Sequence, residues 1–243
     1  MKKSLANKLS LFFSGVVLVT CLILVGITVL IFGNIRERME NVLYENTLES
    51  YKTEVKSEVQ SAISSVEYYY NLSEDGKIDE DTAKKDALET LRNLRYGDDA
   101  SGYFWVDDTD YNLVMHPILP EQEGTNRYDL TDKNGVKIIQ SIMKTADAGG
   151  GFNEFYFTKS DGKTVAPKVA YSQKFDKWNW VITTGIYSDD IQGIVQKSTG
   201  LNRIIKIFSG STSFLIVVTV VLVVLMLLAF FFFVLFLVIF VAF

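Results

Sequence analysis

The sequence GYFWVDDTDYNLVMHP, residues 102–117, contains a turn between two runs of strand-forming residues. Aromatic and aliphatic residues dominate 102–107 and 111–116, and the turn-forming residues DDTD join the two runs. Such runs around a turn are typical of a β-hairpin. The stretch also holds the only histidine of the 243-residue chain, His116. It is therefore a candidate for a functional site as well as for a hairpin.

Three further strands are predicted downstream of this hairpin. The residues rich in aromatic and β-branched side chains are 152–158, 164–174 and 178–186. The turn SDG, at 160–162, joins the first two of them. A loop at 117–133 and a helix at about 135–146 separate them from the hairpin. The pattern therefore predicts one antiparallel sheet of about five strands.

Helical periodicity marks the regions before and after this sheet. Residues 34–70 lack proline and glycine, and their apolar residues recur every three or four positions. A shorter helix should follow, capped by Asp79 or Asp81, and a last helix should begin at Ser188. We therefore predict an α+β fold, in which a long N-terminal helix backs the sheet.

Two uncharged runs predict membrane spans. Residues 11–33 and 214–243 contain no charge, and each is long enough to cross a hydrocarbon core of about 30 Å. A cleaved signal peptide is the alternative for the first run, but its apolar core is usually shorter. Lysines before the first run favour a cytoplasmic N-terminus. We expect a cytoplasmic segment at 1–10, spans at 11–33 and 211–243, and an extracytoplasmic domain at 34–210, in the inner membrane.

The composition of the middle region excludes several classes of function. It carries all 29 acidic residues and 21 of the 24 lysines and arginines, which argues against nucleic acid as a partner. The single cysteine, Cys21, lies in the first apolar run, so thiol chemistry is not expected outside it. A lone histidine without clustered cysteines predicts no metal site. Hydrolase motifs and phosphate-binding loops are missing from the sequence, so we predict neither an enzyme nor a cofactor.

Four segments carry a family resemblance: LRNLRYGDDASGYFWVDD, NLVMHPILPEQEGT, GGFNEFYF and PKVAYSQKFDKWNWVITTGIYSDDI. Together, within 42–191, they resemble the extracellular single Cache domain, second subtype, of bacterial methyl-accepting chemotaxis proteins. The resemblance implies a PAS-like sheet, a small carboxylate ligand such as acetate, propionate, lactate or pyruvate, and signalling across the membrane in chemotaxis. It also implies a HAMP linker and a signalling hairpin after the second span, which this sequence does not contain.

Other functions remain open at this point. The same sensory region could serve a histidine kinase or a cyclic-nucleotide signalling enzyme whose output domain is missing from this sequence. A cell-surface hydrolase and a structural membrane protein without a ligand are alternatives from other classes.

A carboxylate site needs a cation, one or two neutral donors and an apolar wall. Arg92 and Arg95 lie in LRNLRYG, where the short helix approaches the first strand. We favour Arg95, because Arg95 and Tyr96 resemble the Arg-Tyr pair of the family, and expect Arg95→Ala to abolish binding. The alternative is that both arginines are solvated cations at a helix end.

The hairpin supplies further candidates. Tyr103 and Trp105 share one face of the first strand, because side chains alternate along a strand, whereas Phe104 should pack beneath the long helix. We interpret Tyr103 and Trp105 as ligand contacts. The alternative is that they are ordinary aromatic core residues. His116, held extended by the following Pro117, is expected to donate a hydrogen bond to the ligand. A satisfied buried histidine is its alternative.

The segment PKVAY adds Lys168 and Tyr171 as candidates. Residues three apart point to opposite faces of a regular strand, so a bulge is required, or one of the two faces away from the ligand. Their alternatives are an exposed lysine and a core tyrosine. The WNW segment, Trp178–Trp180, is interpreted as core.

The long helix suggests how the chain could assemble and signal. We expect a homodimer in which these helices pair side by side. The residues predicted to face the partner are Leu48, Tyr51, Val55, Val59 and Val66. A ligand with different affinities for two states of the sheet would then shift one helix against another through the bilayer.

Overall fold

The computed structural model describes residues 2–97, 100–159, 161–197, 218–220, 222–227, 230–231 and 234. The chain divides into two compact units, one of residues 1–43 and 195–243 and the other Tyr44–Ile194. Helix α1, Lys2–Glu74, begins in the first unit and ends in the second. The predicted domain boundaries at 34 and 210 stay predictions.

The first unit contains the apolar part of α1. Within the described residues, one helical segment, Ser14–Glu74, includes a stretch long and apolar enough to cross a membrane. In the second predicted span, 211–243, the described residues 218–220 and 222–227 are helical, and most of the remainder lies outside the described residues. The second span therefore stays a prediction.

Five antiparallel strands form the sheet of the second unit, as the sequence predicts. Their order is β2-β1-β5-β4-β3, so the hairpin joins the rest of the sheet through the last strand of the chain. The strands are β1 Trp105–Asp108, β2 Leu113–Met115, β3 Gly151–Thr158, β4 Val165–Phe175 and β5 Trp180–Tyr187. Trp105 pairs with Thr183, and Lys168 pairs with Tyr187, which brings residues from three strands together.

The remaining helices follow the predicted pattern. They are α2 Glu80–Asn93, α3 Ile138–Asp147 and α4 Ser188–Lys197, and a short 3-10 helix, η1, covers Pro120–Gln122. Asp79 is the N-cap of α2, because its Oδ1 accepts a hydrogen bond from the backbone N–H of Thr82 at 2.9 Å. This settles the choice between Asp79 and Asp81.

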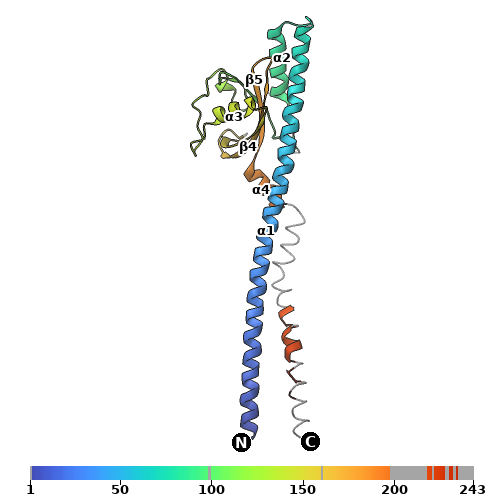
Figure 1. Ribbon diagram of the computed structural model, residues 1–243, viewed down its shortest axis with the longest axis vertical. Coiled ribbons are helices and arrows are strands. Elements are labelled where there is room, and N and C mark those ends of the chain that lie inside the picture. Colours follow the sequence, from blue (N-terminus) through green and yellow to red (C-terminus); the bar gives the residue numbers. More distant parts are fainter. Residues whose placement is uncertain are drawn as a thin grey trace. The chain divides into compact units, whose positions relative to one another are not determined.

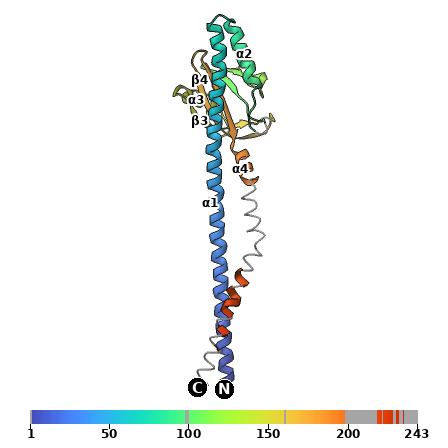
Figure 2. The same ribbon diagram turned by 90° about the vertical axis from the view of Figure 1, so that its right-hand side faces the viewer.

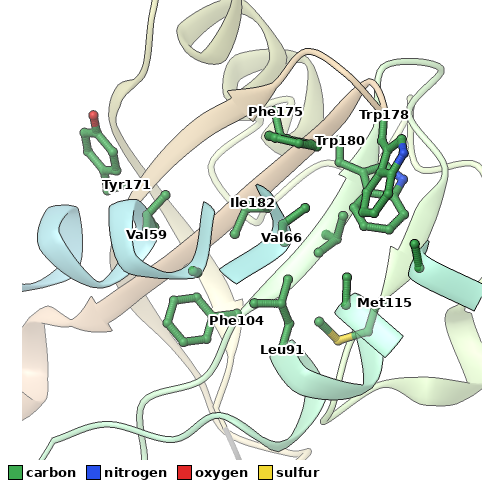
Figure 3. Close-up of a cluster of buried hydrophobic side chains, with 14 of the residues drawn as sticks. Val59, Val66, Leu91, Phe104, Met115, Tyr171, Phe175, Trp178, Trp180 and Ile182 are labelled. Carbon is green, nitrogen blue, oxygen red and sulfur yellow. The ribbon is translucent and has the colours of Figure 1, made fainter. Parts of the chain in front are cut away.

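One face of the sheet packs against α1 and α2, which lie side by side (Figures 1 and 2). We call this core the α1 core: Ile182 of β5 and Phe104, which directly precedes β1, meet Val59 and Val66 of α1 there, and Leu91 joins them from α2 (Figure 3). The predicted place of Phe104 beneath the long helix is confirmed.

This packing corrects the predicted partner-facing surface of α1. Val55, Val59 and Val66 are almost completely buried inside the chain itself, and Leu48 is buried as well. Their periodicity marks the face that covers the sheet, because a helix backing a sheet needs the same apolar spacing as a helix pairing with another helix.

The opposite face of the sheet holds a second core, covered by α3 and by the loop that follows β2 (Figure 1). Its members from β1 and the residues before it are Tyr103 and Trp105. The alternation of side chains along this segment therefore divides its residues between two cores.

Candidate functional site

Lys168 lies at the centre of an aromatic cluster on the α3 side of the sheet. Its side chain is only 1% exposed, and its Nζ donates a hydrogen bond to the Tyr103 hydroxyl at 2.9 Å. The ammonium lies 4.2 Å from the ring centre of Tyr103, 4.8 Å from that of Trp105 and 4.7 Å from that of Tyr187. Phe157 lies farther away, at 5.8 Å. We call these residues, together with His116, the Lys168 cluster.

The Lys168 ammonium has no acidic partner in the described residues. No aspartate or glutamate oxygen among them lies within 4.0 Å of its Nζ. Contacts with aromatic rings compensate part of the lost hydration, by about 0.5–2 kcal/mol each. A buried ammonium without a counter-charge still costs several kcal/mol, so this arrangement favours the entry of an anion.

His116 directs an N–H group into the same core. Its Nδ1 accepts hydrogen bonds from the backbone N–H groups of Ile118 at 3.1 Å and Leu119 at 3.2 Å. The neutral imidazole therefore carries its proton on Nε2. That atom is buried and has no hydrogen-bond partner in the described part of the chain. The ring lies 5.4 Å from Tyr103 and 6.0 Å from Trp105, between centroids, so the unused donor belongs to the Lys168 cluster.

The surroundings of His116 keep it neutral. Burial lowers its pKa from the ordinary value of 6.5 to about 3, and the positive charges of Lys168, Arg127 and Arg92 contribute to the shift. A protonated ring would also direct an N–H at the two backbone N–H groups that Nδ1 now accepts from. His116 is therefore a neutral donor across the physiological pH range.

This pKa shift makes the fold sensitive to acid. Below pH 6.5 the unfolded chain protonates His116 and the folded chain does not, so stability falls as the pH falls toward 3. Between pH 7.5 and pH 4.5 we expect His116 to account for about 2–3 kcal/mol of lost unfolding free energy. Urea unfolding of the wild type and of His116→Gln at both pH values measures this difference. Equal losses in the two proteins would contradict it.

A buried ion pair, Asp107 with Arg127, lies next to the Lys168 cluster. Asp107 follows Trp105 on the same face of β1, and its Oδ2 accepts a hydrogen bond from Trp105 Nε1 at 3.2 Å. Its Oδ1 accepts from Arg127 Nε at 3.0 Å and also from Nη2. Burial raises the pKa of Asp107, and the guanidinium opposes that rise. The permanent positive charge of Arg127 and the N–H groups that it donates to Oδ1 favour the ionised form of Asp107.

Arg127 was not among the residues predicted from the sequence. It lies in the loop after β2, which has no regular periodicity. The available signal was Asp107, because an acid that alternates with Tyr103 and Trp105 on a core-facing side of a strand needs a buried cation as its partner.

Arg92 supports the site from outside the Lys168 cluster. Its two terminal nitrogens bind the two carboxylate oxygens of Glu123 at 2.7 and 2.9 Å. Glu123 Oε1 also accepts from the backbone N–H of His116 at 2.8 Å. Burial raises the pKa of Glu123, but these hydrogen bonds outweigh burial and leave it below its usual value. The Arg92–Glu123 pair therefore positions the backbone that carries His116.

Three other predicted residues also lie outside the Lys168 cluster. Arg95 is exposed and donates to the backbone oxygens of Arg92 and Leu94 at the end of α2. Tyr96 shares a 2.5 Å hydrogen bond with Thr184 and packs on Phe104 in the α1 core. Burial raises its pKa, so its hydroxyl stays neutral.

Tyr171 belongs to the α1 core as well (Figure 3). Lys168 and Tyr171 thus face opposite sides of β4, as a spacing of three requires without a bulge. Both indoles of the WNW segment, Trp178 and Trp180, lie in the α1 core as predicted.

The structure thus brings together four of the eight predicted residues: Tyr103, Trp105, His116 and Lys168. It adds Phe157 and Tyr187 as ring contacts of the ammonium. The Trp105 indole N–H is already used by Asp107, so Trp105 offers a ring face and not a donor. A cation, a hydroxyl, a free N–H and flat apolar rings together suit a small anion with a short apolar tail.

Comparisons with known proteins agree with this fold. Residues 48–199 match the family model described as single Cache domain 2. The sensor histidine kinase MctS of Rhizobium johnstonii is 33% identical over 159 residues, which cover 65% of this chain and 33% of the kinase. The methyl-accepting chemotaxis protein McpP of Pseudomonas putida is 30% identical over 135 residues, which cover 55% and 24%. The chain spans a third or less of the length of these two relatives.

Solved structures of sensory domains also match this fold. The periplasmic sensor domain of a chemotaxis protein matches with a TM-score of 0.55 and 33% identity, over 58% of this chain and 96% of that domain. A Cache chemosensory domain solved to explain carboxylic acid recognition matches with a TM-score of 0.55 and 25% identity, over 59% and 97%. The resemblance in the sequence is thereby confirmed, and the chain belongs to the single Cache domain 2 family of sensory domains.

Proposed function

We propose that this chain is the sensory region of a transmembrane chemoreceptor and that the Lys168 cluster binds a short carboxylate. One observation carries the proposal: the ammonium of Lys168 is buried with no acidic side chain of the described residues to neutralise it, and the rings around it also contact His116, whose Nε2–H has no partner among the described residues. A carboxylate supplies the missing charge and accepts both hydrogen bonds. Acetate, propionate, lactate and pyruvate are the candidates.

The aromatic rings around Lys168 would give the tail of this anion apolar surfaces to contact. In our proposal the carboxylate lies between Lys168 and His116, and its tail contacts the rings of Trp105 and Phe157. The solved Cache chemosensory domain described for carboxylic acid recognition supports this ligand class by analogy.

Tyr187 provides a path from the proposed ligand to α4. Its ring contacts the Lys168 ammonium, and its hydroxyl lies 3.5 Å from the Tyr103 hydroxyl and 2.5 Å from the backbone oxygen of Thr158. Tyr187 ends β5, and α4 begins at the next residue. A ligand that draws Lys168 away from these rings therefore acts on the start of α4, which is the coupling that we propose for signalling.

The first turn of α4 is tied to the same region. Lys159, next to Thr158, pairs with Asp189 at 2.8 Å and with Asp190 at 2.7 Å. Both aspartates also suit the positive end of a helix dipole. A movement of the turn between β3 and β4 would therefore be transmitted to α4 through the ion pairs of Lys159 with Asp189 and Asp190.

The membrane arrangement is part of the proposal. The apolar part of α1 would cross the inner membrane, a second span would lie within 211–243, and the Cache domain would face the periplasm. The periplasmic sensor domain among the similar structures supports this side of the membrane. A homodimer remains part of the proposal, through a surface other than the buried face of α1.

A sensory region of a histidine kinase is the second candidate. The 33% identity to a sensor histidine kinase favours it specifically. Both candidates share the ligand site and differ in the output module. The coding sequence that follows residue 243 separates them: a HAMP linker and a methylated coiled coil indicate a chemoreceptor, whereas kinase domains indicate the alternative.

Isothermal titration of the chain, purified in detergent, tests the ligand class. We expect saturable binding of at least one of acetate, propionate, lactate and pyruvate. Propionamide, a neutral analogue of propionate with the same shape, should not bind, because it cannot neutralise Lys168. No binding of any of the four acids, or equal binding of propionate and propionamide, would sink the proposal.

A further inference from the structure

Asp107 and Arg127 form an ion pair that the binding of a single carboxylate does not use. Asp107 is 0% exposed and Arg127 4% exposed, which places both among the buried polar side chains of the described residues. Replacing such a pair with apolar residues is often neutral or stabilising, so it is weak evidence for a purely structural role. Its position next to the Lys168 cluster suggests a role in ligand choice.

The indole of Trp105 connects the pair to the cluster. Its Nε1 donates to Asp107, while its ring faces the Lys168 ammonium at 4.8 Å and the His116 ring at 6.0 Å. Arg127 Nη1 is buried and has no hydrogen-bond partner in the described part of the domain, so the pairing with Asp107 does not use every N–H group of the guanidinium. The charge of Arg127 also reaches the cluster, because it helps to lower the pKa of His116.

The charges of the region sum to a single positive charge. Lys168 and Arg127 each carry one positive charge, Asp107 carries one negative charge, and His116 is neutral. Arg92 and Glu123, the neighbouring pair, cancel each other. Without Asp107 the region would carry two positive charges, and one of the cations would present an unused N–H.

We propose that Asp107 is a specificity-determining residue: by neutralising Arg127, it limits the site to anions with one negative charge. This inference rests on the proposed function, because it assumes that the Lys168 cluster binds a carboxylate. A dicarboxylate would bring a second negative charge beside Asp107, where it meets a like charge and a guanidinium whose charge Asp107 already neutralises. In low-dielectric surroundings such an unmatched charge is strongly unfavourable.

The wild-type chain can be tested with three ligands, by calorimetric titration in detergent. Propionate is a small monoanion, succinate is a dianion, and monomethyl succinate is a monoanion larger than succinate. If charge determines selection, monomethyl succinate should bind at least about tenfold more tightly than succinate. If size determines selection, the larger ester should bind more weakly. Equal or weaker binding of the ester overturns the inference.

Asp107→Asn tests the residue itself. The variant keeps the shape of the side chain and removes its charge, so the affinity ratio of succinate to propionate should rise by about tenfold or more. In the double variant Asp107→Asn/Arg127→Gln the net charge returns to that of the wild type, and the ratio should return with it. A ratio unchanged in Asp107→Asn, or still raised in the double variant, overturns the inference.

Asp129→Asn is the matched control. It also removes a carboxylate from a cation, Lys137 at 3.1 Å, and changes the net charge by the same amount, but both residues lie outside the Lys168 cluster. Its ratio of succinate to propionate should stay within about twofold of the wild type. A rise as large as that in Asp107→Asn would mean that only the total charge matters.

The possible failures can be told apart. If Asp107→Asn does not fold, which circular dichroism shows, the three ligands on the wild type and the folded double variant still decide the question. If the wild type binds no short carboxylate, the proposed function fails, and this inference fails with it. If it binds propionate but the ratios do not follow the charge, the inference alone is wrong.

Discussion

Lys168→Met should abolish ligand binding and at the same time stabilise the fold. Methionine occupies a similar volume without a charge, so the carboxylate loses its counter-ion, and affinity should fall by about 100-fold or more, as for other buried charge pairs that lose one partner. The unfolding free energy should rise by about 1–4 kcal/mol, because a buried charge without an acidic partner is replaced by an apolar group. Titration with propionate and urea unfolding measure the two effects.

The combination of effects makes this test specific. A lysine with a structural role would lower both stability and binding when replaced. Lys174→Met is the matched control on the same strand, because Lys174 has acidic neighbours, Asp147 and Asp176, each at 3.5 Å. It should leave affinity within about twofold of the wild type. Lys168→Met with full affinity, or with reduced stability, would contradict our account of the site.

Arg95 gives a further comparison for the same measurement. The sequence favours it as the carboxylate partner, whereas the structure places its side chain on the carbonyl groups at the end of α2. Arg95→Ala should therefore keep the affinity for propionate. Loss of binding in this variant would restore the expectation drawn from the sequence.

Phe104→Ala should destabilise the domain by about 3–5 kcal/mol, the usual range for deleting a large aromatic side chain from a core. Phe104 is 2% exposed and packs against Tyr96 in the core beneath α1, with 5.5 Å between the ring centres. The cavity would lie where the sheet meets the helix, so the variant removes contacts on both sides of it. Urea or thermal unfolding measures the loss.

The control for this variant is Phe152→Ala. Phe152 is 37% exposed at the start of β3, so its deletion should cost about 1 kcal/mol or less. Where it is still folded, Phe104→Ala should also bind propionate like the wild type, because Phe104 and Lys168 lie in different cores. A loss of stability equal to that of Phe152→Ala would show that Phe104 does not carry this interface.

The fold could be predicted from the sequence because its signals are local. Apolar residues every three or four positions mark α1 and α2, and the runs rich in aromatic and β-branched residues mark all five strands. The pairing of β1 with β5 was not predicted, because nothing near either strand records which distant strand lies beside it. The same periodicity of α1 was assigned to a second copy of the chain, because spacing shows that a face is apolar and not what covers it.

The site could be predicted only in part. Alternation along the first strand correctly separated Tyr103 and Trp105 from Phe104. The spacing of three in PKVAY required either a bulge or that one of Lys168 and Tyr171 face away from the ligand, and Tyr171 does face the opposite side. Arg95 was favoured as a cation at a promising place in the chain, but its side chain is exposed. Arg127 and Tyr187 join the region through tertiary contacts, so they could not be found by local reasoning alone.

The division of β1 between two cores has an evolutionary consequence. Phe104 and Val106 pack toward α1, while Tyr103, Trp105 and Asp107 face the opposite side. Substitutions at the odd-numbered positions can therefore alter chemical preference while the neighbours that anchor the scaffold stay unchanged. A lineage with this arrangement can change the chemistry of the α3 side one residue at a time, while the core that holds α1 against the sheet stays the same.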